Sequence, residues 1–339
     1  MYKILTIHAR LIIGVLIGAC LASFASFLFA NTASGTGGMG EGSVRIHSTQ
    51  TDSLIAPLLL CGSTEPKDFG EYKSLESELK KTIAAATSNG TATQVSVYAR
   101  DMKGTWVGVN EDRTFTPASL MKVPLMIAYL KQAEGNPALL HQKLTYDGTD
   151  DLNKAEVFKS TSDLEPGSYT IDTLLHAMIS DSDNNAMALL LNNIDTNYLS
   201  EIYTDLGLSV PGSGEANVDF ITPKQYSYFF RILYNATYLN SLYSEKALKL
   251  LAEADFTQGI RSIIPPNTIV AQKFGERTEI TSRGEIVGHE LHDCGIVYDS
   301  QKPYFLCIMT KGANFQDLIK VIQSIATVVQ SRMHLSSSL

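Results

Sequence analysis

The residues whose types and spacing most clearly indicate catalysis are Ser119 and Lys122. They lie three positions apart after the lead-in Phe115-Thr116-Pro117-Ala118. At the start of a helix, residues at this spacing share one face, so the two side chains can approach each other. A serine hydroxyl is a weak nucleophile until a base takes its proton, and a lysine is such a base only when neutral. Burial and a second cation both lower the pKa of a lysine. The pair predicts an activated serine whose backbone N–H, at a helix N-terminus, would stabilise an oxyanion.

This spacing alone is not specific, because Ser77 and Lys80 repeat it. Those two residues belong to a charged amphipathic pattern, for which an exposed helix face is the simpler interpretation. Ser119 differs because apolar residues surround it, and an unpaired hydroxyl and ammonium are costly in such surroundings.

Two further polar clusters interrupt apolar stretches downstream. Ser182-Asp183-Asn184 breaks a helical pattern, and Lys273-Phe274-Gly275 follows the apolar strand-like residues 269–272. Taken alone, the first cluster is typical of a helix N-cap. The second, taken alone, is a lysine near a strand end, although its glycine indicates that a ligand approaches the strand closely. The order of the three clusters carries more information than any one of them.

That order, Ser-x-x-Lys, then Ser-Asp-Asn, then Lys-x-Gly, resembles the motif series of class A β-lactamases and penicillin-binding proteins. The lead-in at 115–118, Thr173-Leu174-Leu175 before the second motif and a terminal helix after the last strands extend the resemblance over roughly residues 70–333. It implies a serine acyl-enzyme hydrolase of the β-lactamase or DD-peptidase type. Its substrates would be β-lactams and/or D-alanyl-D-alanine cell-wall peptides, and it would need no cofactor or metal.

The resemblance implies a catalytic role for three residues. Ser119 would be the acylated nucleophile, and Lys122 the base or the residue that orients it. Ser182 would pass a proton to the leaving nitrogen. Asp183, in the same motif, would be structural.

Four further residues would bind the substrate on the same grounds. Asn184 would hold its side-chain amide, and Lys273 would hold Ser182 and attract its carboxylate. Gly275 and Glu276 would complete the set, with the backbone N–H of Glu276 as the second donor of the oxyanion hole. Lys273 would also help to keep Lys122 neutral.

Two departures from the family pattern bear on turnover. Phe274 stands where the family has a hydroxyl residue, which removes a donor to the substrate carboxylate. The loop motif Glu-x-x-Leu-Asn, whose glutamate activates the deacylating water, does not occur after Ser-Asp-Asn. Glu215 is the only glutamate in the corresponding stretch, 208–223, and is either a substitute base or an ordinary loop carboxylate.

Two other classes of function therefore stay open. One is a catalytically impaired penicillin-binding or ligand-sensing module on the same fold, which Phe274 favours. The other is a membrane-tethered structural domain, which the presence of Ser119, Lys122, Ser182 and Asn184 disfavours.

Charge and composition exclude some partners. The net charge is −8, with 44% hydrophobic and 18% charged residues, so the chain can bury a large core but lacks the basic surface that nucleic acid requires. No cysteine spacing indicates a zinc site. A small anionic substrate is compatible with local lysines in an acidic protein.

The N-terminus predicts export. Residues 11–30 are uncharged and long enough to cross about 30 Å of hydrocarbon, with Lys3 and Arg10 on the cytoplasmic side. A cleaved signal peptide and a lipoprotein signal ending at Cys20 are the alternatives. We therefore divide the chain into an anchor or signal segment at 1–30, a Gly/Ser/Thr-rich linker at 31–57 and a hydrolase domain at 58–339, placed outside the cytoplasm.

Periodicity predicts an α+β fold. Tyr72, Leu75, Leu79 and Ile83 indicate a first helix, and the alternation around 95–99 and 106–110 indicates a hairpin. Further helices are expected at 115–134, 171–193, 224–254 and 315–329, and strands at 268–275, 293–298 and 304–310. The simplest arrangement is one antiparallel sheet from both ends of the domain, covered by helices, with an all-helical subdomain between.

Four residues near the last strands have two interpretations each. His292 and Asp293 open a predicted strand, where they either line the site near Lys273 or form an ordinary satisfied pair. Cys294 and Cys307 flank a predicted turn, and export would permit a disulfide between them, although cross-strand geometry is often unfavourable.

Overall fold

A five-stranded antiparallel sheet organises the domain, in the order β2-β1-β7-β6-β5. The computed structural model describes residues 53–57, 70–159, 163–209, 218–299 and 302–335. The strands are β1 Gln94–Asp101, β2 Trp106–Val109, β5 Val270–Ile280, β6 Ile286–Val297 and β7 Tyr304–Gly312. Strands from the two ends of the domain meet where β1 pairs with β7. The predicted fold class is confirmed.

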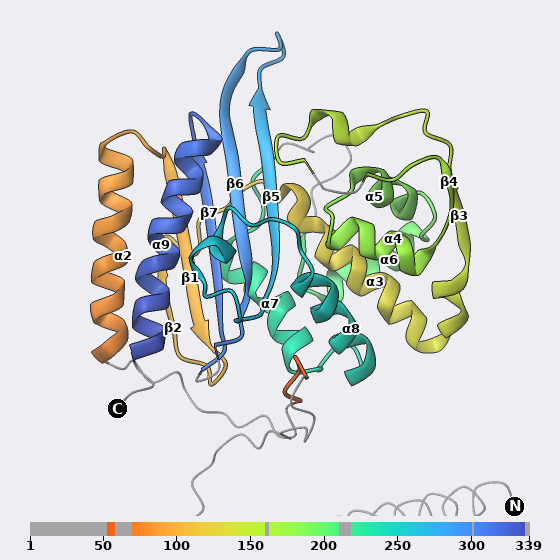
Figure 1. Cartoon of the computed structure of the whole chain (residues 1–339), viewed down its shortest axis with the longest axis horizontal. Helices are drawn as coiled ribbons and strands as arrows, with labels where there is room; N and C mark the ends of the chain where they lie inside the picture. The colour runs from red at the N-terminus through yellow and green to blue at the C-terminus, as the bar shows by residue number, and fades with distance from the viewer. Residues whose placement is uncertain (1–52, 58–69, 160–162, 210–217, 300–301, 336–339) are drawn as a thin grey trace, which may run out of the picture. The chain divides into compact units, whose positions relative to one another are not determined.

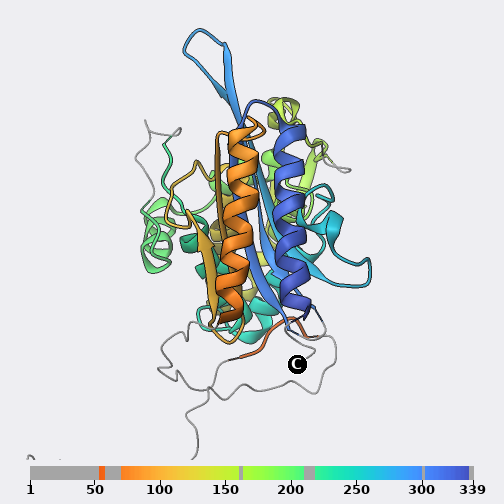
Figure 2. The same cartoon turned by 90° about the vertical axis from the view of Figure 1, so that its left-hand side faces the viewer.

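Two terminal helices cover one face of the sheet. Helices α2 (Gly70–Ser88) and α9 (Phe315–Leu335) lie side by side along the strands (Figures 1 and 2). Leu75, Leu79 and Ile322 are buried between these helices and the sheet. The helical periodicity noted above therefore marks the face that packs on the strands.

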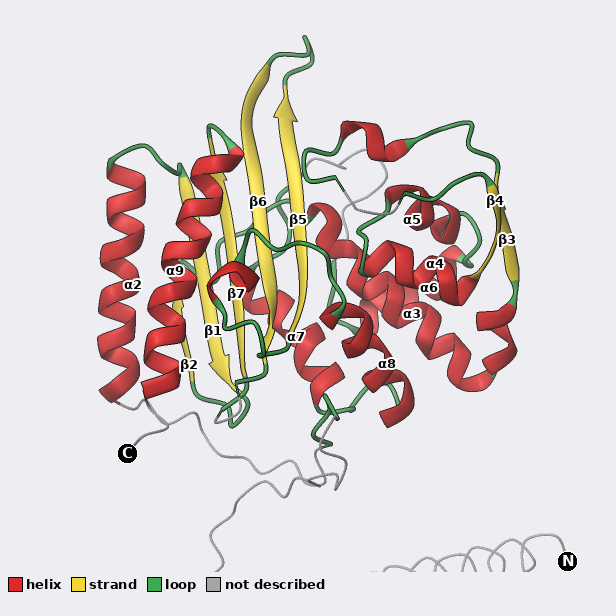
Figure 3. Ribbon diagram, in the orientation of Figure 1, coloured by secondary structure: helices red, strands yellow, loops and turns green. Residues whose placement is uncertain are grey.

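The other side of the sheet carries the helical block. It contains α3 Lys122–Gly135, α4 Ile171–Ile179, α5 Asn184–Leu191, α6 Thr196–Asp205, α7 Pro223–Tyr234 and α8 Ser241–Ala252 (Figure 3). A short two-stranded sheet, β3 (Lys143–Tyr146) with β4 (Gly167–Thr170), was not predicted. Edge strand β5 is the strand of the large sheet that faces this block (Figure 1), which places the border between the two parts beside the Lys273 motif.

Five predicted elements differ from the observed ones. The helix expected at 115–134 begins at Lys122, because Phe115 pairs with Ile221 in an isolated bridge and a 3-10 helix, η1 (Ala118–Met121), comes first. Pro124 therefore lies in the first helical turn, where an N–H has no intrahelical partner to lose. The expected helices at 171–193 and 224–254 are each two helices, and β5 and β6 are longer than expected because they continue into a projecting hairpin (Figure 1).

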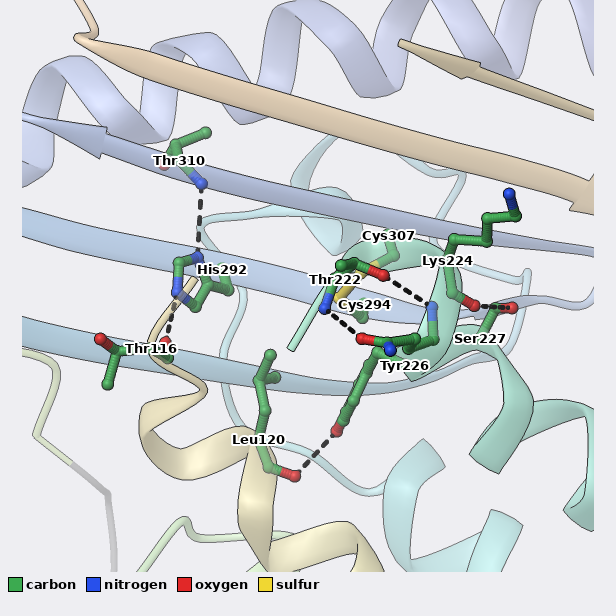
Figure 4. The surroundings of a disulfide bond; sticks show 11 residues. Thr116, Leu120, Thr222, Lys224, Tyr226, Ser227, His292, Cys294, Cys307 and Thr310 are labelled. Carbon is green, nitrogen blue, oxygen red and sulfur yellow. Dashed lines mark hydrogen bonds between the residues drawn. A yellow bond between two sulfur atoms is a disulfide. The ribbon is translucent and has the colours of Figure 1, made fainter. Parts of the chain in front are cut away.

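A disulfide joins the two middle strands. Cys294 of β6 pairs directly with Cys307 of β7, both side chains are fully buried, and their sulfurs are bonded (Figure 4). Of the two interpretations left open by the sequence, the structure has the bridge.

The N-terminal segments are described only in part. Residues 53–57, at the end of the expected linker, contact the domain: Leu54 is buried, and its N–H donates to Glu245 at 2.9 Å. Among the described helices, none is long and apolar enough to span a bilayer. The predicted anchor at 11–30 lies outside the described residues, as does Glu215.

Candidate active site

The turn that carries Ser119 has an uncommon backbone. Ser119 is half-buried in η1, and the preceding residue, Ala118, has φ 48°, in the left-handed region that side chains with a Cβ avoid. Neighbouring groups hold the turn: the hydroxyl of buried Tyr226 donates to the carbonyl of Leu120 at 3.1 Å (Figure 4). Strain of this kind persists only where the surroundings enforce it, and it is frequent at functional sites.

Gly275 allows strand β5 to pack against this turn. A Cβ at Gly275 would lie 2.9 Å from the carbonyl oxygen of Pro117 and 3.4 Å from the nitrogen of Leu120. The sequence predicts that a ligand approaches the strand at this glycine, and in the structure the groups that approach it are the Pro117 carbonyl and Leu120. The close packing sets β5 against η1, the turn that carries Ser119, which is the arrangement that the expected oxyanion hole requires.

Three polar side chains from distant segments meet beside the nucleophile turn. Ser182 Oγ lies 2.8 Å from Nζ of Lys273 and 3.2 Å from Nζ of Lys122. Lys122 also donates to the carbonyl oxygen of Ser182. All three side chains are almost completely buried, and Ser182 has φ 59°. The structure thus brings together Lys122, Ser182 and Lys273, for which catalytic or carboxylate-binding roles are predicted, beside the turn that carries Ser119.

Burial changes the protonation of both lysines. Desolvation lowers the pKa of Lys122 to about 8, while Glu156, Asp183 and Glu276 act against the shift. The pKa of Lys273 falls well below its usual value, through desolvation first and the charge of Lys122 second. Lys122 therefore loses its proton far more readily than an exposed lysine, and loss of water is the main cause.

The Ser-Asp-Asn segment is both an N-cap and a part of this cluster. Asp183 caps α5 by accepting the N–H of Ala186 at 2.7 Å, and its other oxygen accepts from Asn153 and from the N–H of Leu164. Asn184 is half-buried, and its Nδ2 donates to Glu156 Oε1 at 2.7 Å. The capping interpretation applies to Asp183, and it leaves the side chains of Ser182 and Asn184 available to the site.

Glu156 is a site residue that the sequence analysis missed. Burial raises the pKa of its carboxyl group to about 7, while the charges of Lys122 and Lys273 act against this shift. The only local signal was the N-cap Asp151 that starts the short 3-10 helix η3 (Leu152–Ala155) just before it. Position 156 carries no motif, so only the folded chain shows that it reaches Asn184.

The residues after Lys273 are held by the segment that contains Glu156. The carboxylate of Glu276 accepts the N–H groups of Val157 at 3.0 Å and Phe158 at 2.9 Å. The ring of Phe274 stacks on Phe256 with 4.2 Å between centroids, and Nζ of Lys273 lies 4.5 Å from its centroid. Phe274 thus gives Lys273 an aromatic neighbour and no hydroxyl group.

His292 and Asp293 lie in the middle of β6, not at its start. His292 Nε2 is 3.0 Å from the carbonyl oxygen of Thr116, which supports the lead-in to Ser119 (Figure 4). Asp293 Oδ2 accepts the N–H of Ile260 at 2.7 Å, and desolvation raises the pKa of this carboxyl group to about 7. Both residues are fully buried and bonded to the main chain, so they act as supports.

The fold and the family define this protein as a serine hydrolase of the β-lactamase type. The chain belongs to the β-lactamase enzyme family, whose model matches residues 75–333.

Solved structures with a similar fold include β-lactamases and a penicillin-binding protein. A class A β-lactamase from Mycobacterium abscessus has 22% identity and a TM-score of 0.63, covering 77% of this chain and 99% of that one. The TLA-1 extended-spectrum β-lactamase has 19% identity and a TM-score of 0.64 over 77% and 99%. A mutant of PBP-A, solved as an acyl-enzyme complex with penicillin G, has 17% identity and a TM-score of 0.64 over 77% and 97%. No curated protein matches in sequence.

Proposed function

We propose that the protein is a serine acyl-enzyme hydrolase that acts on β-lactams and/or D-alanyl-D-alanine peptides. The observation that carries the proposal is the hydroxyl of Ser182, which lies within 3.2 Å of two buried lysines beside the Ser119 turn. A structural domain has no need for two buried lysine side chains around one hydroxyl, because desolvating each amino group costs folding free energy.

Acylation can be written with these groups. Neutral Lys122 takes the proton of Ser119 while the serine oxygen attacks the carbonyl carbon of the substrate. The backbone N–H groups of Ser119 and Glu276 would stabilise the oxyanion. When the carbon–nitrogen bond breaks, Ser182 gives its proton to the leaving nitrogen and regains one from Lys122 or Lys273. Lys273 would attract the substrate carboxylate.

The experiment that tests this function uses a reporter penicillin and the full-length chain in detergent. Intact mass and drug hydrolysis are followed over time, with Ser119→Ala as the control. The proposal expects hydrolysis, a covalent adduct or both on the parent protein and neither on the variant. Absence of both at high drug concentration would overturn it. Release of D-alanine from a D-alanyl-D-alanine peptide then separates the DD-peptidase from the β-lactamase branch.

A second candidate is a penicillin-binding or ligand-sensing module that is acylated but does not turn over. Phe274 favours it, because no hydroxyl group stands beside Lys273 at that position to receive a substrate carboxylate. Its signature in the same experiment is an adduct that persists for hours without accumulation of hydrolysed drug.

We also propose that the domain lies outside the cytoplasm and is tethered by residues 11–30, as the uncharged run and its basic flank suggest. A buried disulfide suits an oxidising compartment. Protease treatment of intact cells would digest a domain exposed outside the cytoplasmic membrane, and the mass of the purified protein would show whether the segment is retained.

A further inference from the structure

Glu156 lies in a segment that joins the two halves of the site. Residues 152–158 run from the start of α5 on the helical side to the edge strand β5, and Glu156 is near the middle of this run. This placement brings the carboxylate of Glu156 into contact with Asn184 of the Ser-Asp-Asn segment.

The helical side of the segment is fixed by Asn153. Its Nδ2 donates to Asp183 Oδ2 at 3.0 Å, and its Oδ1 accepts the N–H of Asn184 at 2.8 Å. The N–H of Leu152 donates to Asn185 at 2.7 Å. Three residues before Glu156, the chain is therefore bonded to the same Ser-Asp-Asn segment that supplies Ser182.

The strand side is fixed just after Glu156. The N–H groups of Val157 and Phe158 both donate to the carboxylate of Glu276, and the Phe158 ring packs edge-on against Phe256 and Phe315 with centroids 5.3 Å apart in each pair. With anchors on both sides, the Glu156 side chain has little freedom to leave the site. Such anchoring is what a catalytic group needs.

The orientation of the Glu156 carboxylate leaves one oxygen available. Oε1 accepts from Asn184, while no described donor is bonded to Oε2. An asparagine amide has two N–H groups, so Asn184 can hold Glu156 with one and a substrate amide carbonyl with the other. The predicted role of Asn184 in substrate binding is thus compatible with its bond to Glu156.

We propose that Glu156 is the catalytic carboxylate that activates the water molecule for hydrolysis of the acyl-Ser119 ester. The inference rests on the proposed function and deepens it: it supplies the base that the missing loop glutamate leaves unassigned. Glu156 takes a proton from water as the water oxygen attacks the acyl carbonyl carbon. The tetrahedral intermediate then expels Ser119 Oγ, which regains a proton from Glu156, through Lys122 or directly. The product is the free acid, and both residues return to their starting state.

Three features support this role over that of a simple clamp on Asn184. Glu156 has Lys122, the neighbour of the reacting serine, as its strongest charged partner. Its pKa, raised to about 7 by burial, suits a base that works near neutral pH. A clamp would need no ionisable group, since an amide could accept the same hydrogen bond from Asn184.

The test compares Glu156→Gln with the parent, with Glu165→Gln as the matched control. Glu165 is an exposed glutamate nearby whose carboxylate has no role in the site. Full-length protein is mixed with the reporter penicillin, and the rates of adduct formation and adduct loss are measured separately by intact mass. We expect Glu156→Gln to be acylated within a few-fold of the parent rate and to lose its adduct about 10²-fold or more slowly. The control should behave as the parent in both steps.

The pH dependence of the deacylation rate distinguishes a base from a residue with a purely structural role, because only the base must be ionised for the reaction. Lys122, Lys273 and Glu276 are the charged groups that face Glu156, and only the carboxylate form of Glu156 can take a proton from water. Deacylation of the parent should rise with pH to a plateau, with half of the rise near pH 7, whereas Glu156→Gln should lack this rise.

Several results would overturn the inference, and they differ from failure of the proposed function. Unchanged adduct loss in Glu156→Gln would remove its role as base, and slow loss in Glu215→Gln instead would move that role to Glu215. Faster acylation of Glu156→Gln with unchanged adduct loss would show that the segment obstructs the site. A parent adduct that persists for hours would show that no efficient base exists, while leaving the acyl-serine chemistry intact. A parent that neither acylates nor hydrolyses would overturn both proposals.

Discussion

Nζ of Lys273 and Oγ of Ser182 lie 2.8 Å apart, although one belongs to the edge strand β5 and the other to the turn before α5. This bond joins the sheet to the helical block. Lys122, at the start of α3, makes a second bond to the same hydroxyl. Because all three side chains are buried, bulk solvent competes little with this contact.

Ser182→Ala tests the proton path. The change leaves two buried lysines without their shared hydroxyl, so acylation by penicillin should fall about 10²-fold or more. Ser180→Ala is the matched control, because Ser180 is equally buried and donates to the carbonyl of Leu250 at 2.9 Å outside the site. It should cost about 1 kcal/mol of unfolding free energy and leave acylation unchanged. Equal acylation rates for the two variants would contradict the assignment.

The pH dependence of acylation reports on Lys122. Its pKa is lowered to about 8, and only the neutral amine can accept the proton of Ser119. Since the neutral fraction grows as pH rises, the acylation rate should increase from pH 6, reach half of its plateau near pH 8 and level off above about pH 9. Lys122→Arg keeps the charge permanently, so it should lose acylation at every pH in this range. A parent profile that is flat from pH 6 to 9 would exclude Lys122 as the base.

Gly275→Ala tests the close packing between β5 and the nucleophile turn. The added Cβ would meet the Pro117 carbonyl at 2.9 Å, a backbone atom that cannot move aside cheaply. We expect a loss of about 1–3 kcal/mol of stability in denaturant unfolding, together with slower acylation as Ser119 and Glu276 separate. Gly288→Ala, on the same hairpin, would meet the flexible end of the Glu279 side chain at 3.1 Å and the Gly312 carbonyl oxygen at an ordinary contact distance of 3.5 Å, so it should do neither. An unaffected Gly275→Ala would show that the turn can shift.

Asp183→Ala tests the structural role of the central residue of the Ser-Asp-Asn segment. The variant loses the cap on α5 and the acceptor for both Asn153 and Leu164, so it should be destabilised by about 2 kcal/mol or more. Asp195→Ala removes an exposed cap with a single bond to Tyr198 and should cost about 1 kcal/mol. Thermal unfolding measures both. A smaller loss at Asp183 than at Asp195 would contradict its position as a buried anchor.

The elements with clear periodicity were predicted well because their burial repeats along the chain. The amphipathic pattern of Leu75 and Leu79 marks α2, and the alternation at 95–99 marks β1. The outer half of the β5–β6 hairpin was not predicted, because both faces of its strands are exposed, as at Ile280 and Val287. Apolar and polar residues therefore do not alternate there, and this alternation is the sequence signal of a half-buried strand. The start of α3 was misplaced because apolar residues continue through η1.

Site residues that belong to short sequence motifs could be predicted, whereas those that reach the site only through tertiary contacts could not. Ser119, Ser182 and Lys273 each belong to a short motif, and the structure brings Ser182 and Lys273 together beside the turn that carries Ser119. Glu156 was not predicted, because its meaning depends on a segment that crosses between two parts of the fold. The sequence predicts a close approach at Gly275, but it does not show that the approaching groups are the Pro117 carbonyl and Leu120.

The central claim is that Ser119 becomes acylated, and peptide mapping of the penicillin adduct tests it most directly. The parent protein, or Glu156→Gln if the parent turns over too quickly, is treated with the drug, digested and analysed by mass spectrometry. The account predicts the added mass on the peptide that contains Ser119 and nowhere else, and its loss in Ser119→Ala. An adduct on a different residue, or one that survives in Ser119→Ala, would contradict the assignment of the nucleophile.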